Sequence, residues 1–165
     1  MNQNKTLAAK DKQIANLTAM LKEAQARPVA KEEPQAEEVK QNLGGTLEVE
    51  VVEAKLERST EMWGKQDPFA ELSIRLQKFK TKTQTDGAKA PVWNETATMD
   101  VLDPTEEMAV QVFDEDVTAN DLICEGTVNL AALCLDTPVD AWFALHFDGK
   151  PSGSIHLRTK YIPRP

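Results

Sequence analysis

The chain has few of the residues that cross-link a fold or carry out catalysis. Its 165 residues include only two cysteines, Cys124 and Cys134, and two histidines. Two cysteines do not make a disulfide framework, and neither has a second cysteine or histidine at the spacing of a metal site. We therefore expect both thiols to be reduced and partly buried.

A hydrolase needs a nucleophile with a placed base, and the sequence offers little to serve as either. His146 and His156 both fall in the last two predicted strands and have no partner motif. No glycine-rich phosphate loop precedes a helix. We predict that the protein is not an enzyme.

The sequence also lacks long apolar runs. No stretch approaches the roughly 20 apolar residues that a membrane-spanning helix needs. The polar start, Met1 to Thr6, has no apolar core of a secretory signal. The expected location is cytoplasmic, either at a membrane surface or associated with the cytoskeleton.

Basic residues are few in residues 44–165, the part of the chain that we expect to fold. Residues 1–43 hold seven of the 19 Lys and Arg and six of the 27 Asp and Glu, which leaves 12 basic and 21 acidic residues for 44–165. A nucleic-acid-binding surface needs a basic face. The composition therefore excludes general nucleic-acid binding.

The first 43 residues divide into two segments. Residues 5–26 contain no Gly or Pro, and their larger apolar residues follow the seam spacing of a short coiled coil: Leu7, Ile14, Leu17, Leu21 and Ala24. We predict a helix over 1–27 that pairs with itself or with a protein partner; the alternative is a marginal helix that frays. Residues 28–43 form an acidic linker rich in Pro and Glu.

Residues 44–165 carry repeated short runs in which apolar and polar residues alternate, the pattern of strands with one buried face. The runs lie at Thr46–Val52, Ala70–Ile74, Phe79–Thr83, Trp93–Val101, Met108–Val112, Ile123–Leu130, Trp142–Leu145 and Ile155–Tyr161. Eight such strands separated by turn-rich loops predict an all-β, antiparallel sandwich or barrel.

Four stretches of this region, in order, resemble the C2 domain, a calcium- and phospholipid-binding β-sandwich. They are the opening strand GTLEVEVVEAKLE, the turn GKQDPFAEL, the segment KFKTKTQTDGAKAPVWNET and the loop VFDEDVTANDLICEG. These stretches are most similar to those of small single-domain plant and protist members of the C2 family. The resemblance implies an eight-stranded C2-like sandwich over 44–165.

The resemblance places a calcium site at one end of the sandwich, because calcium prefers carboxylate oxygens on flexible loops. Its ligands would be Glu61, Asp67, Asp114, Asp116 and Asp121. The spacing between the last two acids is one residue shorter than is common in the family, and Glu61 replaces the usual Asp. These departures favour one calcium ion at modest affinity. The alternative is a set of solvated loop acids that hold no metal.

Two further groups indicate membrane contact. Met62 and Trp63 fall at the tip of the first loop, where a Trp suits a membrane interface or, alternatively, folds back onto the sandwich. Lys78, Lys80 and Lys82 alternate along one strand and look like the phosphoinositide-binding strand of the family. Alternatively, the lysines only protect an exposed strand from edge pairing.

The two hypotheses for function differ in their dependence on calcium. The first is a peripheral adaptor that binds anionic phospholipid or phosphoinositide membranes when calcium fills the acidic loops. The second is a calcium-independent module for protein contacts within a larger cytoskeletal or ciliary assembly.

Overall fold

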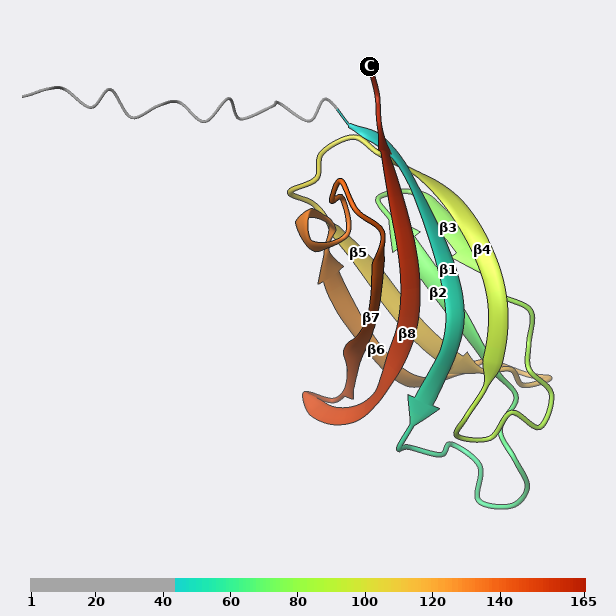
Figure 1. Ribbon diagram of the computed structural model, residues 1–165. Coiled ribbons are helices and arrows are strands. Elements are labelled where there is room, and N and C mark those ends of the chain that lie inside the picture. The colour runs from blue at the N-terminus through green and yellow to red at the C-terminus, as the bar shows by residue number, and fades with distance from the viewer. Residues whose placement is uncertain (1–43) are drawn as a thin grey trace, which may run out of the picture. The chain divides into compact units, whose positions relative to one another are not determined.

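The computed structural model describes residues 44–165, which fold into strands joined by loops (Figure 1). The strands are β1 (Gly45–Leu56), β2 (Pro68–Ile74), β3 (Gln77–Lys80), β4 (Val92–Val101), β5 (Glu107–Asp114), β6 (Asp121–Asn129), β7 (Val139–Phe147) and β8 (Lys150–Pro163). A single 3-10 turn, η1 (Leu130–Ala132), follows β6. In the described region, no helix is long and apolar enough to cross a membrane.

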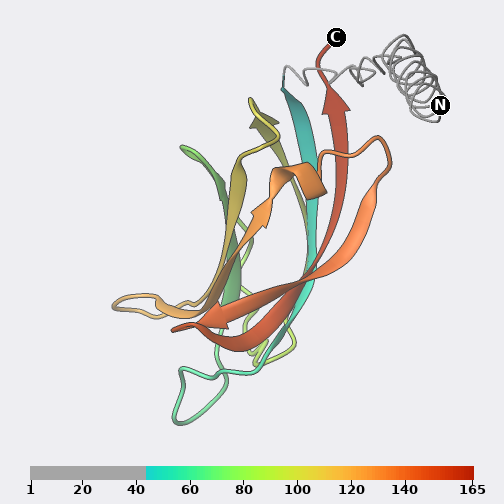
Figure 2. The same ribbon diagram turned by 90° about the vertical axis from the view of Figure 1, so that its left-hand side faces the viewer.

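The strands are antiparallel and follow the order β3-β2-β5-β6-β7-β8-β1-β4. β6 and β7 are paired only at Glu125 and His146, so the sheet folds over at this point into two layers of four strands. Figure 2 shows β2, β3 and β5 on one side and β1 and β8 on the other. The predicted antiparallel sandwich is confirmed.

The core lies between the two layers and is built by strand alternation. Successive side chains of a strand point to opposite faces, so every second residue of β1, β2 and β5 enters the interior. The inward sets are Leu47, Val49 and Val51 on β1, Ala70, Leu72 and Ile74 on β2, and Met108, Val110 and Val112 on β5, and none exposes measurable surface. Burial of these side chains is the main stabilising contribution to the fold.

The eight predicted runs fall on the eight strands, and most of the strands are longer than the runs that predict them. The predicted run Phe79–Thr83 extends past β3, which ends at Lys80. The Thr81 N–H still donates to the Ala70 carbonyl, but the Thr81 hydroxyl accepts the N–H of Ala70 at 3.0 Å in place of a backbone carbonyl, so the ladder ends there. Lys82 therefore follows the strand.

Both cysteines are free and buried in the core. Burial raises the pKa of the Cys124 thiol to about 12 and that of Cys134 to about 11, because a thiolate is poorly solvated there. These thiols are unreactive packing groups. The predicted helix over 1–27 with its partner, and the linker over 28–43, lie outside the described residues and stay predictions.

Three loops meet at one end of the sandwich: β1–β2, β3–β4 and β5–β6 (Figure 1). The first strand begins, and the last ends, at the opposite end, where Gly45 pairs with Pro163. The loop end is where the acids of the sequence pattern gather.

Candidate functional site

The phase of β5 brings a carboxylate to the open end of the sandwich. Asp114 is the last residue of the strand and continues the inward alternation of Met108, Val110 and Val112. Its side chain is therefore buried, with 1% of its surface exposed. Asp116 lies two residues farther on in the loop.

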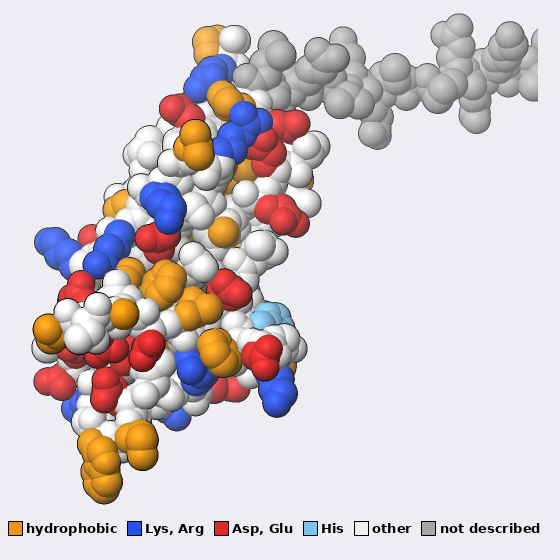
Figure 3. Space-filling model, turned by 180° about the vertical axis from the view of Figure 1, so that it is seen from behind, with side chains coloured by type: hydrophobic (Ala, Val, Ile, Leu, Met, Phe, Trp, Pro, Cys, Tyr) orange, Lys and Arg blue, Asp and Glu red, His pale blue; other side chains and the backbone are white. Residues whose placement is uncertain are grey.

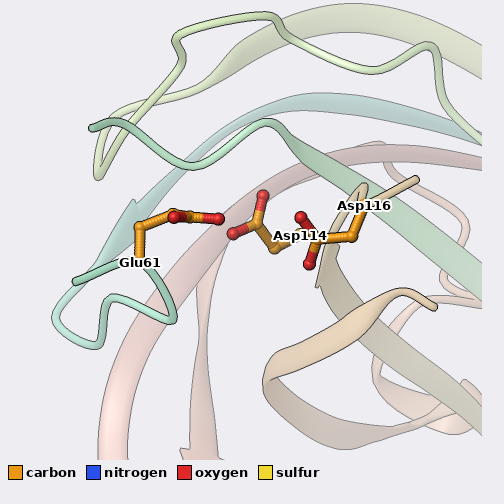
Figure 4. Close-up of side chains that lie close together, drawn as sticks. All are labelled: Glu61, Asp114 and Asp116. Atoms are coloured by element: carbon orange, nitrogen blue, oxygen red, sulfur yellow. The ribbon is translucent and has the colours of Figure 1, made fainter. Parts of the chain in front are cut away.

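Three carboxylates converge here. Glu61, Asp114 and Asp116 each offer a carboxylate oxygen within 4.8 Å of the other two. Figure 4 shows Asp114 between Glu61, from the β1–β2 loop, and Asp116, from the β5–β6 loop. We call Glu61, Asp114 and Asp116 the acidic cup. Its oxygens are of the type that calcium prefers.

The two remaining predicted ligands flank the acidic cup without joining that group of three. Asp67 precedes Pro68, which pairs with Asp114, and Asp121 pairs with Asp114 across β5 and β6. One oxygen of Asp67 accepts the N–H of Asp86 at 2.7 Å. Asp67 thus holds the β3–β4 loop.

The acids repel one another electrostatically. The pKa of Asp116 is raised, first because partial burial removes water from its carboxylate and then because Asp114, Asp121 and Asp67 are negative neighbours. A carboxyl group with a raised pKa costs folding free energy when it is ionised, and that cost is relieved as pH falls through its pKa. A bound cation would relieve the same repulsion.

Asp114 is buried and hydrogen-bonded, unlike a solvated loop acid. Its Oδ1 accepts the N–H of Asp67 at 2.6 Å, and its Oδ2 accepts the hydroxyl of Thr60. A buried carboxylate needs such donors because it has lost its water. Asp114 therefore holds the β1–β2 and β5–β6 loops together, in addition to its place in the acidic cup.

Sequence reasoning missed Gln66, which is 1% exposed behind the acidic cup. Its Nε2 donates to the carbonyls of Ala88 at 2.6 Å and Arg58 at 3.3 Å, while Oε1 accepts the N–H of Thr60 at 3.3 Å. Thr60 in turn donates to Asp114. This relay connects all three loops. Its only sequence signal is a polar residue directly before the Asp-Pro turn.

Replacing the buried Gln66 with Leu should lower the free energy of unfolding by about 2–4 kcal/mol, because partly buried groups of Arg58, Thr60 and Ala88 lose their hydrogen-bond partner. Urea denaturation measures the change. Gln84→Leu is the matched control, since the Gln84 side chain is only partly buried in the β3–β4 loop. Equal small losses in both variants would contradict the relay.

An apolar tip extends beyond the acids. Met62 and Trp63 are 90% and 87% exposed on the β1–β2 loop, and Val117 is fully exposed on the β5–β6 loop. Figure 3 shows apolar side chains at the lower tip of the molecule, beneath a concentration of acidic ones. Trp63 does not fold back onto the sandwich, which removes the alternative considered for it.

The three predicted lysines are exposed and alternate with the more buried Phe79, Thr81 and Thr83. Two of them are paired with acids. Lys78 Nζ lies 2.8 Å from a Glu71 oxygen and Lys80 Nζ lies 3.0 Å from a Glu115 oxygen. At Lys82 the backbone N–H, and not the ammonium group, donates to Glu95 at 2.8 Å. The ion pairs therefore reduce the positive charge of this face at Lys78 and Lys80.

Sequence comparison finds relatives over the same region. The chain is 34% identical to synaptotagmin-5 of Arabidopsis thaliana over 129 residues, which is 72% of this chain and 23% of that protein. It is 31% identical to the 16 kDa phloem protein 2 of Arabidopsis thaliana, covering 66% of this chain and 83% of the relative. The chain thus spans less than a quarter of the synaptotagmin and most of the phloem protein.

Solved structures show the same architecture. The C2 domain-containing protein from a putative elicitor-responsive gene superposes with a TM-score of 0.64 at 28% identity, covering 74% of this chain and 91% of the other. The calcium-bound tandem C2 domains of extended synaptotagmin 2 give 0.61 at 26% identity, covering 72% and 46%. The family model described as C2 domain matches residues 45–145. The chain belongs to the C2 domain family.

Proposed function

We propose that the protein is a peripheral membrane adaptor whose C2 domain binds anionic phospholipid when calcium occupies the acidic cup. The observation that carries the proposal is the convergence of Glu61, Asp114 and Asp116 directly behind an exposed apolar tip. One ion held by these residues would lie where the loops meet a bilayer. Relatives named synaptotagmin and extended synaptotagmin, and a related structure titled calcium bound, support this function.

The chemistry of the acidic cup suits a switch. Residues 44–165 include 21 acidic and 12 basic residues. An anionic leaflet therefore repels the calcium-free domain. One calcium ion offsets two of the negative charges at the loop end and leaves coordination positions for lipid phosphate. The three lysines, Lys78, Lys80 and Lys82, supply a second contact for phosphoinositide headgroups.

Apolar insertion supplies the remaining attachment. Trp is favoured at the membrane interface because its ring is apolar and its N–H finds a polar partner there. Met62 and Trp63 are already exposed, so insertion costs no internal packing. Electrostatic contact and insertion are both needed, since one weak anchor gives only marginal attachment.

The test is co-sedimentation of the full chain with phosphatidylserine-containing vesicles. Binding should appear with calcium and disappear with a chelator. Asp116→Asn should abolish it by removing one ligand charge, and the fold should survive, because the amide is nearly isosteric with this loop carboxylate. Persistent binding to a protein partner with no vesicle binding in either condition would favour the calcium-independent interaction module.

A further inference from the structure

A charge contact connects the lysine strand to the loop of the acidic cup. Lys80 is the last residue of β3, and Glu115 lies between Asp114 and Asp116. Their Nζ and Oε1 atoms are 3.0 Å apart, and the two side chains are about equally exposed, at 44% and 45%. Glu115, which lies between two candidate calcium ligands, thus contacts a lysine that is proposed to bind phosphoinositide.

The contact has a defined geometry. The Lys80 ammonium also lies 3.8 Å from the centroid of the Phe69 ring, which stacks on Phe113 at 5.4 Å. A cation over an aromatic face gains electrostatic attraction. The Lys80 side chain therefore extends over β2 towards the β5–β6 loop.

Further hydrogen bonds hold Glu115 in place. Its backbone N–H donates to the carbonyl of Asp67 at 3.0 Å. Its carboxylate accepts hydrogen bonds from the Thr83 side chain and from the Lys80 ammonium. An anionic headgroup that approaches Lys80 must displace a carboxylate that is already in place.

We propose that Glu115 masks Lys80 from anionic headgroups. This inference rests on the proposed membrane function.

The test uses the full chain in chelator at low salt, with phosphatidylcholine vesicles that contain a phosphatidylinositol bisphosphate. Glu115→Gln should bind these vesicles about fivefold more tightly than wild type, the effect of one additional basic residue near an anionic surface. The double variant Glu115→Gln with Lys80→Ala should lose that gain.

Glu107→Gln is the matched control, because it removes the same charge from an exposed position at the opposite end of β5. An equal gain in Glu107→Gln would overturn the proposal, because net charge alone would then explain it. A gain that survives Lys80→Ala, or no vesicle binding by Glu115→Gln, would also overturn it. A gain seen only with soluble inositol trisphosphate would overturn the assignment to a membrane.

A separate arm keeps the two proposals distinguishable. Calcium-dependent binding to phosphatidylserine vesicles without phosphoinositide tests the proposed function and does not depend on Lys80. Masking by Glu115 is tested in chelator, where the acidic cup holds no calcium. Failure of either arm therefore identifies which proposal is wrong.

Discussion

Millimolar calcium should raise the melting temperature of the protein by about 5–10 °C, if the concentration is near 100 times the dissociation constant. A ligand that binds only the folded state stabilises it by mass action. The acidic cup exists only when the β1–β2 and β5–β6 loops are folded, because Glu61 and Asp114 come from distant parts of the chain. Differential scanning calorimetry in calcium and in chelator measures the shift.

Asp116→Asn should remove this shift and slightly raise the melting temperature of the calcium-free protein. The raised pKa of Asp116 shows that its charge is disfavoured in the fold, so neutralising it relieves repulsion from Asp114, Asp121 and Asp67. Lowering the pH through the pKa of Asp116 should likewise raise the melting temperature of the calcium-free wild-type protein. The same change in pH should have less effect on the variant.

Asp136→Asn is the control for this series, since Asp136 is exposed in the connection between η1 and β7. It should keep the full calcium shift. Melting temperatures that are identical in calcium and chelator for the wild-type protein would rule out calcium binding by the acidic cup.

Trp63→Ala should weaken calcium-dependent binding to anionic vesicles about 10- to 150-fold. Burying a large apolar side chain contributes roughly 1.5–3 kcal/mol, and Trp63 is exposed at the tip of the β1–β2 loop. Apolar insertion is little affected by salt, so the loss should be similar at every ionic strength. Vesicle co-sedimentation across a salt series measures it.

Leu76→Ala controls for the removal of an exposed apolar side chain. Leu76 is 99% exposed on the β2–β3 turn, at the end of the sandwich opposite the acidic cup. Its replacement should leave vesicle binding unchanged. Equal losses in the two variants, or no loss in Trp63→Ala, would show that the loop end is not the inserting surface.

Most of the fold could be predicted from the alternation of apolar and polar residues in the sequence. Leu47, Val49 and Val51 alternate with Glu48 and Glu50, and that period alone places one set inside and the other outside. The end of β3 at Lys80 could not be predicted in this way. It depends on a side-chain hydrogen bond between Thr81 and Ala70, which alternation does not encode.

The acids of the site were predictable as a group, and their individual environments were not. Asp114 and Asp116 share one strand phase, but Asp114 is buried and bonded while Asp116 remains partly exposed. The difference arises from Thr60 and Gln66, which approach from another loop. Long-range contacts of this kind have no local sequence pattern.

The lysine strand shows the same limit more clearly. Its spacing predicts an exposed basic face, and the exposure of Lys78, Lys80 and Lys82 agrees. The acids that pair with Lys78 and Lys80 come from β2 and the β5–β6 loop, at Glu71 and Glu115. Their proximity follows from the folding of the sheet and not from spacing along the chain.

In the proposed function, calcium in the acidic cup attaches the protein to an anionic membrane. Co-sedimentation of the full chain measures this attachment, with vesicles that differ only in phosphatidylserine content, each with and without calcium. We expect binding only when calcium and phosphatidylserine are both present, and none for Asp116→Asn. Binding that is equal in calcium and chelator, or absent in all four conditions, would contradict it.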